Sequence, residues 1–317
     1  MLKQSSAFIR GLHNLKPEHR GSVVTIGSFD GVHLGHQAII KQLKKQAKEL
    51  DLPSVAIIFE PQPHEFFVGD AAPARLMRLK EKALALYEAG INRVCCLAFN
   101  QDLRTLTAAQ FVSRILVDGL GVRYLVVGDD FRFGCDRSGD FEFLQQAGIE
   151  HDFQVSNTHT FEIEAERVSS TRIRTALECA DFKLAQRLLG RPYTILGKVG
   201  YGQQLGRLWG VPTANVQLKR YRAPFSGVYM VKVTLANGDV NAGVANVGVR
   251  PTVGDLEKPI LEVHLLDFDG NLYGMNIGVE FVAKLRDEKK FDSLDALKKQ
   301  ILADVVSAKN YFSNNEN

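Results

Sequence analysis

Gly27-Ser28-Phe29-Asp30-Gly31-Val32-His33-Leu34-Gly35-His36 is the most informative segment of this 317-residue chain. Before it, Ser22–Ile26 is short, apolar and rich in β-branched residues, as expected of a buried strand. After it, from 37 to 50, apolar residues recur at helical spacing, namely Ile39, Ile40, Leu43, Ala47 and Leu50. The segment is therefore predicted to be a turn that leads from a strand into a helix.

A turn of this kind suits a phosphate group. The first N–H groups of a helix have no partner within it, and the helix dipole adds partial positive charge. Gly35 leaves room for an anion between His33 and His36, which share one face of the first turn. The two imidazoles are candidates to stabilise a nucleotide α-phosphate under attack. Two alternatives stay open at this point: the histidines cap the helix, or they form part of a metal site.

The rest of the first half alternates between strand and helix patterns. Strands are predicted at 54–59, 93–99 and 124–127, helices at 77–88 and 107–116, and a loop at 60–67. This alternation predicts an α/β fold with a doubly wound parallel sheet, whose ligands bind at the carboxyl ends of the strands. Two further segments with suitable chemistry are 128–134, with Asp130 and Arg132, and 167–174, whose hydroxyls and arginines could hold phosphates. An ordinary helix cap with solvated arginines is the alternative for the second segment.

The pattern changes after a helical connector at 181–190. Strands are predicted at 194–199, 227–235, 240–247, 259–268 and 277–285, and a helix at 294–312. These closely spaced runs predict an all-β half, a small antiparallel barrel followed by a C-terminal helix. We place the domain boundary between residues 184 and 185, which gives domains 1–184 and 185–317.

Three residues carry the chemistry of the second half. Thr213 and Asn215 are two apart, so on an extended segment their oxygens face the same way and suit Mg²⁺. Glu262 interrupts an apolar strand on the face that also carries His264, where a carboxylate could act as a general base. The glycine-rich segment 200–207 is not a Walker loop. For residues 212–215 a plain turn is the alternative reading.

Composition excludes several classes of protein. A net charge of +3 gives no argument for a nucleic-acid or membrane partner, and Met1–Phe8 lacks the apolar core of a signal peptide. No run is long enough to cross a bilayer. The four cysteines show neither a disulfide framework nor zinc spacing. We expect a cytoplasmic protein, and the sequence leaves self-association open.

Several motifs in order resemble those of bacterial bifunctional riboflavin kinase/FAD synthetases, a family whose first half belongs to the nucleotidyltransferase superfamily. They are Gly27–His36, Phe59-Glu60-Pro61, Gly128–Gly134, Ser169–Arg174, Pro212-Thr213-Ala214-Asn215, Asn246–Thr252, Glu262-Val263-His264 and Leu272-Tyr273-Gly274. The resemblance covers nearly the whole chain. Trp209 is a local departure, since the family commonly has a smaller or more polar residue there.

The resemblance implies that the first domain transfers AMP from ATP to FMN, and that the second phosphorylates riboflavin with Mg-ATP. ATP, riboflavin and FMN would be its partners and Mg²⁺ its cofactor. In the first domain it assigns His33 and His36 to catalysis, and ATP binding to Gly27, Ser28, Phe29, Asp130, Arg132, Arg167, Ser170, Thr171 and Arg174. In the second domain it assigns the general base to Glu262, the metal to Thr213 and Asn215, the flavin to Arg286, and ATP contacts to Gly202, Gly206, Arg207, Thr213 and Asn215.

Two other functions remain as alternatives. One is an adenylyltransferase that acts on a different small phosphorylated acceptor and carries a barrel of unrelated purpose. The other is a non-catalytic, flavin-binding regulator.

Overall fold

The computed structural model describes residues 7–158, 160–201, 209–251 and 257–315. The chain divides into two units, which we describe separately. Unit 1 comprises Met1–Ala72 and Leu79–Ser170, and unit 2 comprises Pro73–Arg78 and Thr171–Asn317. This division groups residues 171–184 with the second half of the chain. The functional boundary expected at 184/185 stays a prediction.

A parallel six-stranded sheet forms the centre of unit 1. Its strand order is β1-β4-β3-β2-β5-β6, and every neighbouring pair is parallel. The strands are β1 (Phe8–Arg10), β2 (Ser22–Ile26), β3 (Ser54–Glu60), β4 (Arg93–Ala98), β5 (Val122–Gly128) and β6 (Gln154–Thr158). The chain order reverses at β2, which lies between β3 and β5, so the ligand crevice is expected at the carboxyl ends of β2 and β5. The predicted doubly wound sheet is confirmed.

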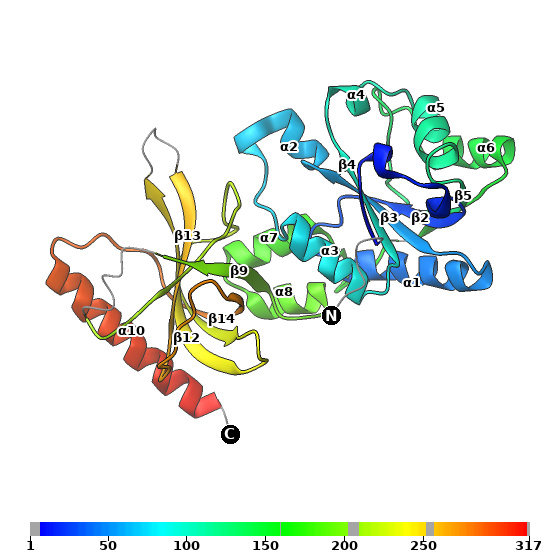
Figure 1. Cartoon of the computed structure of the whole chain (residues 1–317). Helices are drawn as coiled ribbons and strands as arrows, with labels where there is room; N and C mark the ends of the chain where they lie inside the picture. The colour runs from blue at the N-terminus through cyan, green and yellow to red at the C-terminus, as the bar shows by residue number, and fades with distance from the viewer. Residues whose placement is uncertain (1–6, 159, 202–208, 252–256, 316–317) are drawn as a thin grey trace. The chain divides into compact units, whose positions relative to one another are not determined.

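Helices cover both faces of this sheet (Figure 1). The core between sheet and helices includes Val24 and Ile26 of β2 and contacts α5 (Ala108–Phe111), the π-helical η4 (Val112–Val117) and α6 (Phe141–His151). Helices α1 (Leu34–Glu49) and α3 (Leu79–Glu88) lie on the other face (Figure 1). The short remaining elements of unit 1 are η1 (Leu12–Asn14), η2 (Pro17–His19), η3 (Gly69–Ala71), α4 (Gln101–Arg104) and the hairpin strands β7 (Glu162–Ile163) and β8 (Glu166–Arg167).

One local prediction was wrong. Residues 60–67 were expected to be a loop, but they contain helix α2 (Pro63–Val68). Proline is tolerated in the first turn of a helix, because its missing N–H would have no partner there. The Glu65 Oε2 atom accepts a hydrogen bond from the Gln62 N–H at 2.8 Å and so caps the helix start.

Unit 2 is built around a closed barrel of order β10-β13-β12-β11-β14-β9. All neighbouring pairs are antiparallel, which confirms the predicted barrel. Its strands are β9 (Thr194–Gly200), β10 (Ala214–Val216), β11 (Gly227–Thr234), β12 (Val240–Pro251), β13 (Glu257–Leu265) and β14 (Asn276–Arg286).

Among the described residues, the helices that accompany the barrel are α7 (Ser170–Glu178), α8 (Phe182–Leu189) and α10 (Leu294–Asn315). The predicted connector helix is confirmed as α8, whose Phe182 packs edge to face on Tyr229 and Phe225 with ring centroids 5.6 Å apart. Helix α10 packs against the outside of the barrel through Ala308 and Phe312, as Figure 1 shows. A cavity lies between α10 and the barrel, and we describe it below as the candidate site of unit 2.

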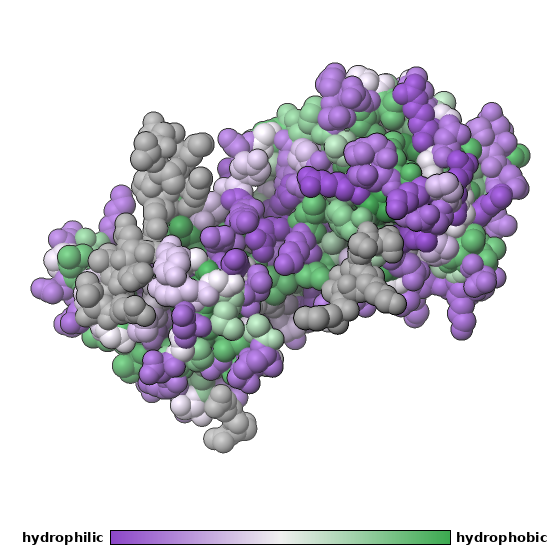
Figure 2. Space-filling view, viewed as in Figure 1, coloured by the Kyte–Doolittle hydropathy of each residue, from purple (hydrophilic) through white to green (hydrophobic). Residues whose placement is uncertain are grey.

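The surface of both units mixes residue types, and hydrophilic ones predominate on the face shown in Figure 2. Within the described parts of the chain, no helix has both the length and the apolar character that crossing a bilayer requires.

Candidate active sites

The turn after β2 has an unusual backbone conformation. Phe29 and Val32 have positive φ angles of 47° and 41°, and Gly31 has 87°. A positive φ is especially costly for a β-branched residue such as valine, and conformations of this kind cost about 1–3 kcal/mol each. Both side chains are almost fully buried, so packing holds the strained turn in place. Strain of this kind is typical of functional sites.

His33 is the N-cap of helix α1. Its Nδ1 atom accepts a hydrogen bond from the backbone N–H of His36 at 3.3 Å, and only 6% of the residue is exposed. The capping alternative is therefore correct for His33. The same bond fixes the tautomer of the neutral ring, because an accepting Nδ1 leaves the proton on Nε2. His33 can thus cap the helix and still offer one N–H donor.

His36 stacks on His33, with ring centroids 3.6 Å apart and an interplanar angle of 19°. Its Nδ1 atom is buried and has no hydrogen-bond partner among the described residues. Burial lowers the pKa of His36 well below 6.5, and electrostatic interactions with His33, Lys82 and Arg167 lower it further. His36 is therefore neutral at physiological pH. A neutral imidazole with an unpartnered buried nitrogen is available for a ligand.

The structure brings three of the predicted motifs together in unit 1. A Cβ atom on Gly35 would lie 3.2 Å from the His33 ring and 3.4 Å from the Val168 carbonyl oxygen, so this turn and the 167–170 segment are in close contact. The Ser170 hydroxyl donates to the Asp30 carbonyl at 2.8 Å. Arg167, in the same segment, forms an ion pair with Asp130 at 2.7 Å. The loop after β5 thus joins the other two segments.

The other ATP-binding candidates of the first half have different surroundings. Gly27 and Ser28 begin the turn, and Ser28 is exposed. Arg132 pairs with Asp140, the N-cap of α6, at 3.2 Å. Thr171 and Arg174 belong to unit 2, where Arg174 Nε donates to the Ala74 carbonyl at 2.6 Å.

Sequence reasoning missed an aromatic cluster at the same edge of the sheet. Phe59 of β3, Phe66 and Phe67 of α2, and Phe99 after β4 form edge-to-face pairs with centroid distances of 5.3 to 5.9 Å. Phe67 is 59% exposed, and the Arg104 guanidinium lies 5.7 Å from its ring centroid. The paired phenylalanines in the 60–67 segment were the available signal. The cluster offers exposed aromatic surface beside the carboxyl ends of two strands.

A cavity of about 390 Å³ lies between the outer face of the barrel and α10. This volume falls within the usual range of small-molecule pockets. Apolar side chains from the barrel and α10 form much of its wall. The polar and charged residues that line it are Thr213, Asn215, Asn246, Glu262, His264, Arg286, Glu288, Lys289 and Asp304.

Five of the lining residues form one row across the barrel. Asn215 lies opposite Glu262, Glu262 opposite Asn246, Asn246 opposite Val228, and Val228 opposite Arg286. Directly opposite side chains on neighbouring strands are separated by about 4.5–5.5 Å at Cβ. The register therefore brings the predicted general base, one predicted metal ligand and the predicted flavin residue to one level of one cavity, although up to 71 positions separate them in sequence.

Arg286 is held by a buried ion pair with α10. Its Nε and Nη2 atoms donate to the Asp304 carboxylate at 2.8 to 3.1 Å, and Gln300 donates to the same carboxylate at 2.9 Å. The side chains of Arg286 and Asp304 are 15% and 4% exposed. The arginine expected to contact the flavin is thus fixed in orientation at the cavity wall.

Thr213 also lines a second, smaller cavity of about 80 Å³ together with Asn271 and Tyr273. Tyr273 stacks on Tyr201 with ring centroids 4.3 Å apart. The two cavities therefore share the Thr213 position. The expected phosphate contacts Gly202, Gly206 and Arg207 lie outside the described residues.

The oxygen atoms near Thr213, the residue that lines both cavities, are suitable ligands for Mg²⁺. Thr213 and Asn215 provide a hydroxyl and an amide oxygen, and the Glu262 carboxylate lines the same cavity. Mg²⁺ prefers oxygen ligands and is commonly held by few protein groups together with phosphates.

Among the described residues, no three His, Cys, Asp or Glu side chains gather as a metal site, which argues against the metal alternative for His33 and His36.

Comparison with known proteins identifies two domains in the chain. The FAD synthetase family matches residues 15–172, and the riboflavin kinase family matches residues 189–312. The bifunctional riboflavin kinase/FMN adenylyltransferase of Pseudomonas fluorescens is 60% identical over 301 residues, which span 95% of this chain and 96% of that protein. The protein of the same name from Haemophilus influenzae is 48% identical, over 96% of this chain and 99% of that protein.

A solved structure is also similar over nearly the whole chain. A crystal structure described as a macrolide-efflux protein from Streptococcus pneumoniae has a TM-score of 0.79 and 30% sequence identity, and it covers 96% of this chain and 99% of that one. On the strength of its curated relatives and its two matched domains, the chain belongs to the bifunctional riboflavin kinase/FMN adenylyltransferase family.

Proposed function

We propose that unit 2 phosphorylates riboflavin to FMN with ATP, and that unit 1 transfers AMP from ATP to FMN to form FAD and pyrophosphate. The observation that carries this proposal is that each unit holds its own set of polar residues, the stacked histidines in one and the five-strand row in the other. We place the functional boundary between residues 184 and 185.

In unit 1 the catalytic groups stabilise charge. The FMN phosphate attacks the α-phosphorus of ATP, a bond to that phosphorus forms, and pyrophosphate leaves. His33 and His36 each donate an N–H to the α-phosphate oxygens, whose negative charge grows during the attack. Arg167 and Ser170 hold the phosphates that depart. The Gly27-Ser28-Phe29 turn, Asp130 and Arg132 contact the rest of the nucleotide.

In unit 2 the Glu262 carboxylate acts as general base. It accepts the proton of the riboflavin hydroxyl while that oxygen attacks the γ-phosphorus of ATP and ADP leaves. Thr213 and Asn215 would hold Mg²⁺, which neutralises phosphate charge when it is bound. Gly202, Gly206 and Arg207 contact the ATP phosphates.

The flavin ring needs flat, apolar surfaces in both units. In unit 2 it occupies the cavity between the barrel and α10, beside Arg286. In unit 1 the cluster of Phe59, Phe66, Phe67 and Phe99, in which Phe66 and Phe67 are exposed, provides a surface on which the flavin of FMN stacks.

Two single substitutions test the division of labour. Glu262→Ala should abolish FMN formation from riboflavin and retain conversion of FMN to FAD, whereas His36→Ala should do the reverse. Matched controls are Glu280→Ala, a half-buried glutamate of β14 outside the described cavities, and His151→Ala at the end of α6. Purified protein is given ATP and Mg²⁺ with riboflavin or FMN, and products are separated by chromatography.

The outcomes separate the proposal from its alternatives. Loss of both activities in both folded variants would contradict separate sites. Adenylylation of another phosphorylated acceptor in preference to FMN would favour a different adenylyltransferase. Failure of the wild-type protein to consume ATP with either flavin would favour a non-catalytic flavin-binding regulator. The two matched domains, in this order, disfavour both alternatives.

A further inference from the structure

His264 connects two segments of the kinase site. Its Nδ1 atom lies 2.8 Å from the carbonyl oxygen of Pro212. A carbonyl oxygen can only accept a hydrogen bond, so Nδ1 must carry a proton. In the neutral ring the remaining nitrogen, Nε2, is then an acceptor. The hydrogen bond thus fixes both the tautomer and the direction of the ring.

The bonded carbonyl belongs to the segment that precedes β10. Residues 211–213 lie outside any regular element, between the turn at Gly210 and the three-residue strand β10. Thr213 follows Pro212 directly, and Asn215 is two residues further on. Asn215 is already held by the pairing of β10 with β13, so the His264 side chain adds a bond to β13 at Pro212, next to Thr213 and ahead of the paired residues.

The hydrogen bond to Pro212 comes from strand β13, which also carries Glu262. Glu262 and His264 are two apart on β13, both are half-buried, and both line the cavity of about 390 Å³, whereas Leu261, Val263 and Leu265 between and beside them are buried in the barrel. Two residues on one face of a strand move together. A bond from one of them to Pro212 therefore fixes the distance between the other and Thr213.

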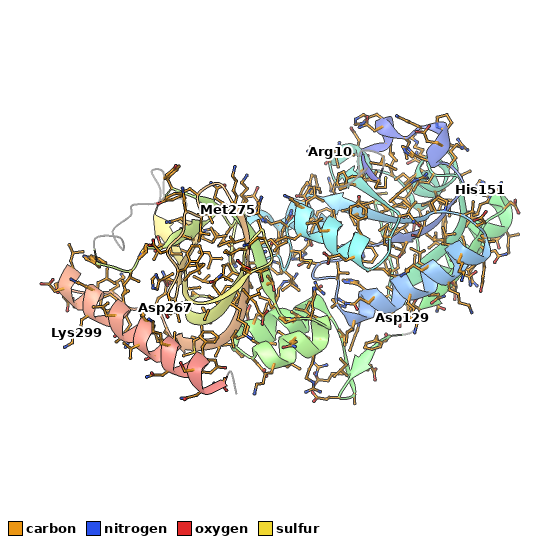
Figure 3. All side chains as sticks on the ribbon, turned by 60° about the horizontal axis from the view of Figure 1, so that its bottom comes forward. Arg10, Asp129, His151, Asp267, Met275 and Lys299 are labelled. Atoms are coloured by element: carbon orange, nitrogen blue, oxygen red, sulfur yellow. The ribbon has the colours of Figure 1, made fainter. Side chains whose placement is uncertain are left out.

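The charge state of His264 is suited to a constant hydrogen bond. Burial lowers the pKa of His264 below 6.5, while the bond to Pro212 opposes this shift; Lys309 lowers the pKa further and Asp267 raises it. Lys309 of α10 and Asp267, which is labelled in Figure 3, form an ion pair with each other at 2.5 Å. With its pKa lowered, the imidazole is neutral at physiological pH and donates through Nδ1.

We propose that His264 is a positioning residue of the riboflavin kinase site: its Nδ1–H holds the Pro212 carbonyl and thereby sets Thr213 against Glu262 for binding of Mg-ATP, while the pairing of β10 with β13 already places Asn215 opposite Glu262. The inference rests on the proposed kinase function of unit 2. It concerns how the ATP-binding segment is held, and it assigns no contact between His264 and substrate.

Three variants of His264 separate the hydrogen bond from the ring itself. His264→Asn keeps a donor near the position of Nδ1, because the asparagine amide lies at the same distance along the side chain. His264→Gln places its amide nearer the position of Nε2, and His264→Phe keeps a ring without a donor. For the Gln and Phe variants we expect the KM for ATP in FMN formation to rise about three- to tenfold, the effect of one lost hydrogen bond. His264→Asn should stay within about twofold of wild type, and the KM for riboflavin should not change.

Each result decides the inference. Equal KM values for ATP in wild type and His264→Phe, or equal impairment of the Asn and Gln variants, would overturn it. A merely structural role would lower the unfolding midpoint of unit 2 in all three variants and leave the KM for ATP unchanged. Should His264→Phe fail to fold, the comparison of the Asn and Gln variants still stands. FMN adenylylation in the same preparations controls for protein quality, and full kinase activity in Glu262→Ala would refute the proposed site instead.

Discussion

Removing the carboxylate of Asp304 should destabilise unit 2 strongly. In Asp304→Ala the Arg286 guanidinium loses its partner in a position where its side chain is 15% exposed, and Gln300 loses its acceptor. Breaking a buried ion pair from one side typically costs about 3–5 kcal/mol, because a buried charge is left without compensation. Because Arg286 is partly exposed, we expect the free energy of unfolding to fall by about 3 kcal/mol, the lower end of this range. The double variant Arg286→Met/Asp304→Leu should recover most of this loss, since an apolar pair leaves no buried charge.

The single tryptophan makes this measurement specific. Trp209 lies in unit 2 and lines the same cavity as Arg286, so its fluorescence during urea unfolding reports on that unit. Asp267→Ala is the matched control, because it removes an exposed ion pair between Asp267 and Lys309, which lies on α10 like Asp304. This substitution should lower the free energy of unfolding by less than about 1 kcal/mol. An Asp304→Ala protein within 1 kcal/mol of wild type by this assay would refute the argument that the buried pair holds α10 to the barrel.

Three further predictions concern the two sites. Because burial lowers the pKa of His36 below 6.5, the folded chain binds fewer protons than the unfolded chain at lower pH, and unit 1 should lose up to about 1.4 kcal/mol of stability per pH unit below that value. His36→Gln should flatten this dependence in urea titrations at pH 7.5 and 5.5; an unchanged slope would count against it. Gly35→Ala should lower kcat/KM for FMN adenylylation about tenfold or more, because its Cβ would press on the His33 ring, while riboflavin phosphorylation in the same sample stays normal. Riboflavin should quench Trp209 emission, with Trp209→Phe as the blank; no quenching at saturating flavin would exclude the flavin from that cavity.

Much of the fold was predictable because its signals are local. The strand at Ser22–Ile26 has the bounds expected from its β-branched run, and helix α8 lies within the connector expected at 181–190. The edge strands β1 and β6 escaped prediction. The first, Phe-Ile-Arg, is too short to show a periodic pattern, and β6, Gln-Val-Ser-Asn-Thr, has a single apolar residue and no buried side chain. Edge strands are held by pairing with a neighbour, which the local sequence does not reveal.

The candidate sites were predictable only in their motifs. Resemblance pointed to His33, His36 and Glu262, and the structure adds how each is held. The Arg286–Asp304 pair depends on α10 folding back along the barrel, and the cluster of Phe59 and Phe99 depends on two strands being neighbours in the sheet. No local pattern encodes such contacts. His33 shows the converse, since its capping role follows from local spacing alone and coexists with the proposed catalytic role.

The row of opposed residues from Asn215 to Arg286 makes the kinase site sensitive to the length of its strands. Successive side chains of a strand point to opposite faces, so deleting one residue of β13 ahead of Glu262 would bring Val263 or Leu261 to the cavity and turn the carboxylate into the barrel interior. Insertions and deletions in relatives should therefore collect in the connections between strands, while the number of residues within each strand is kept.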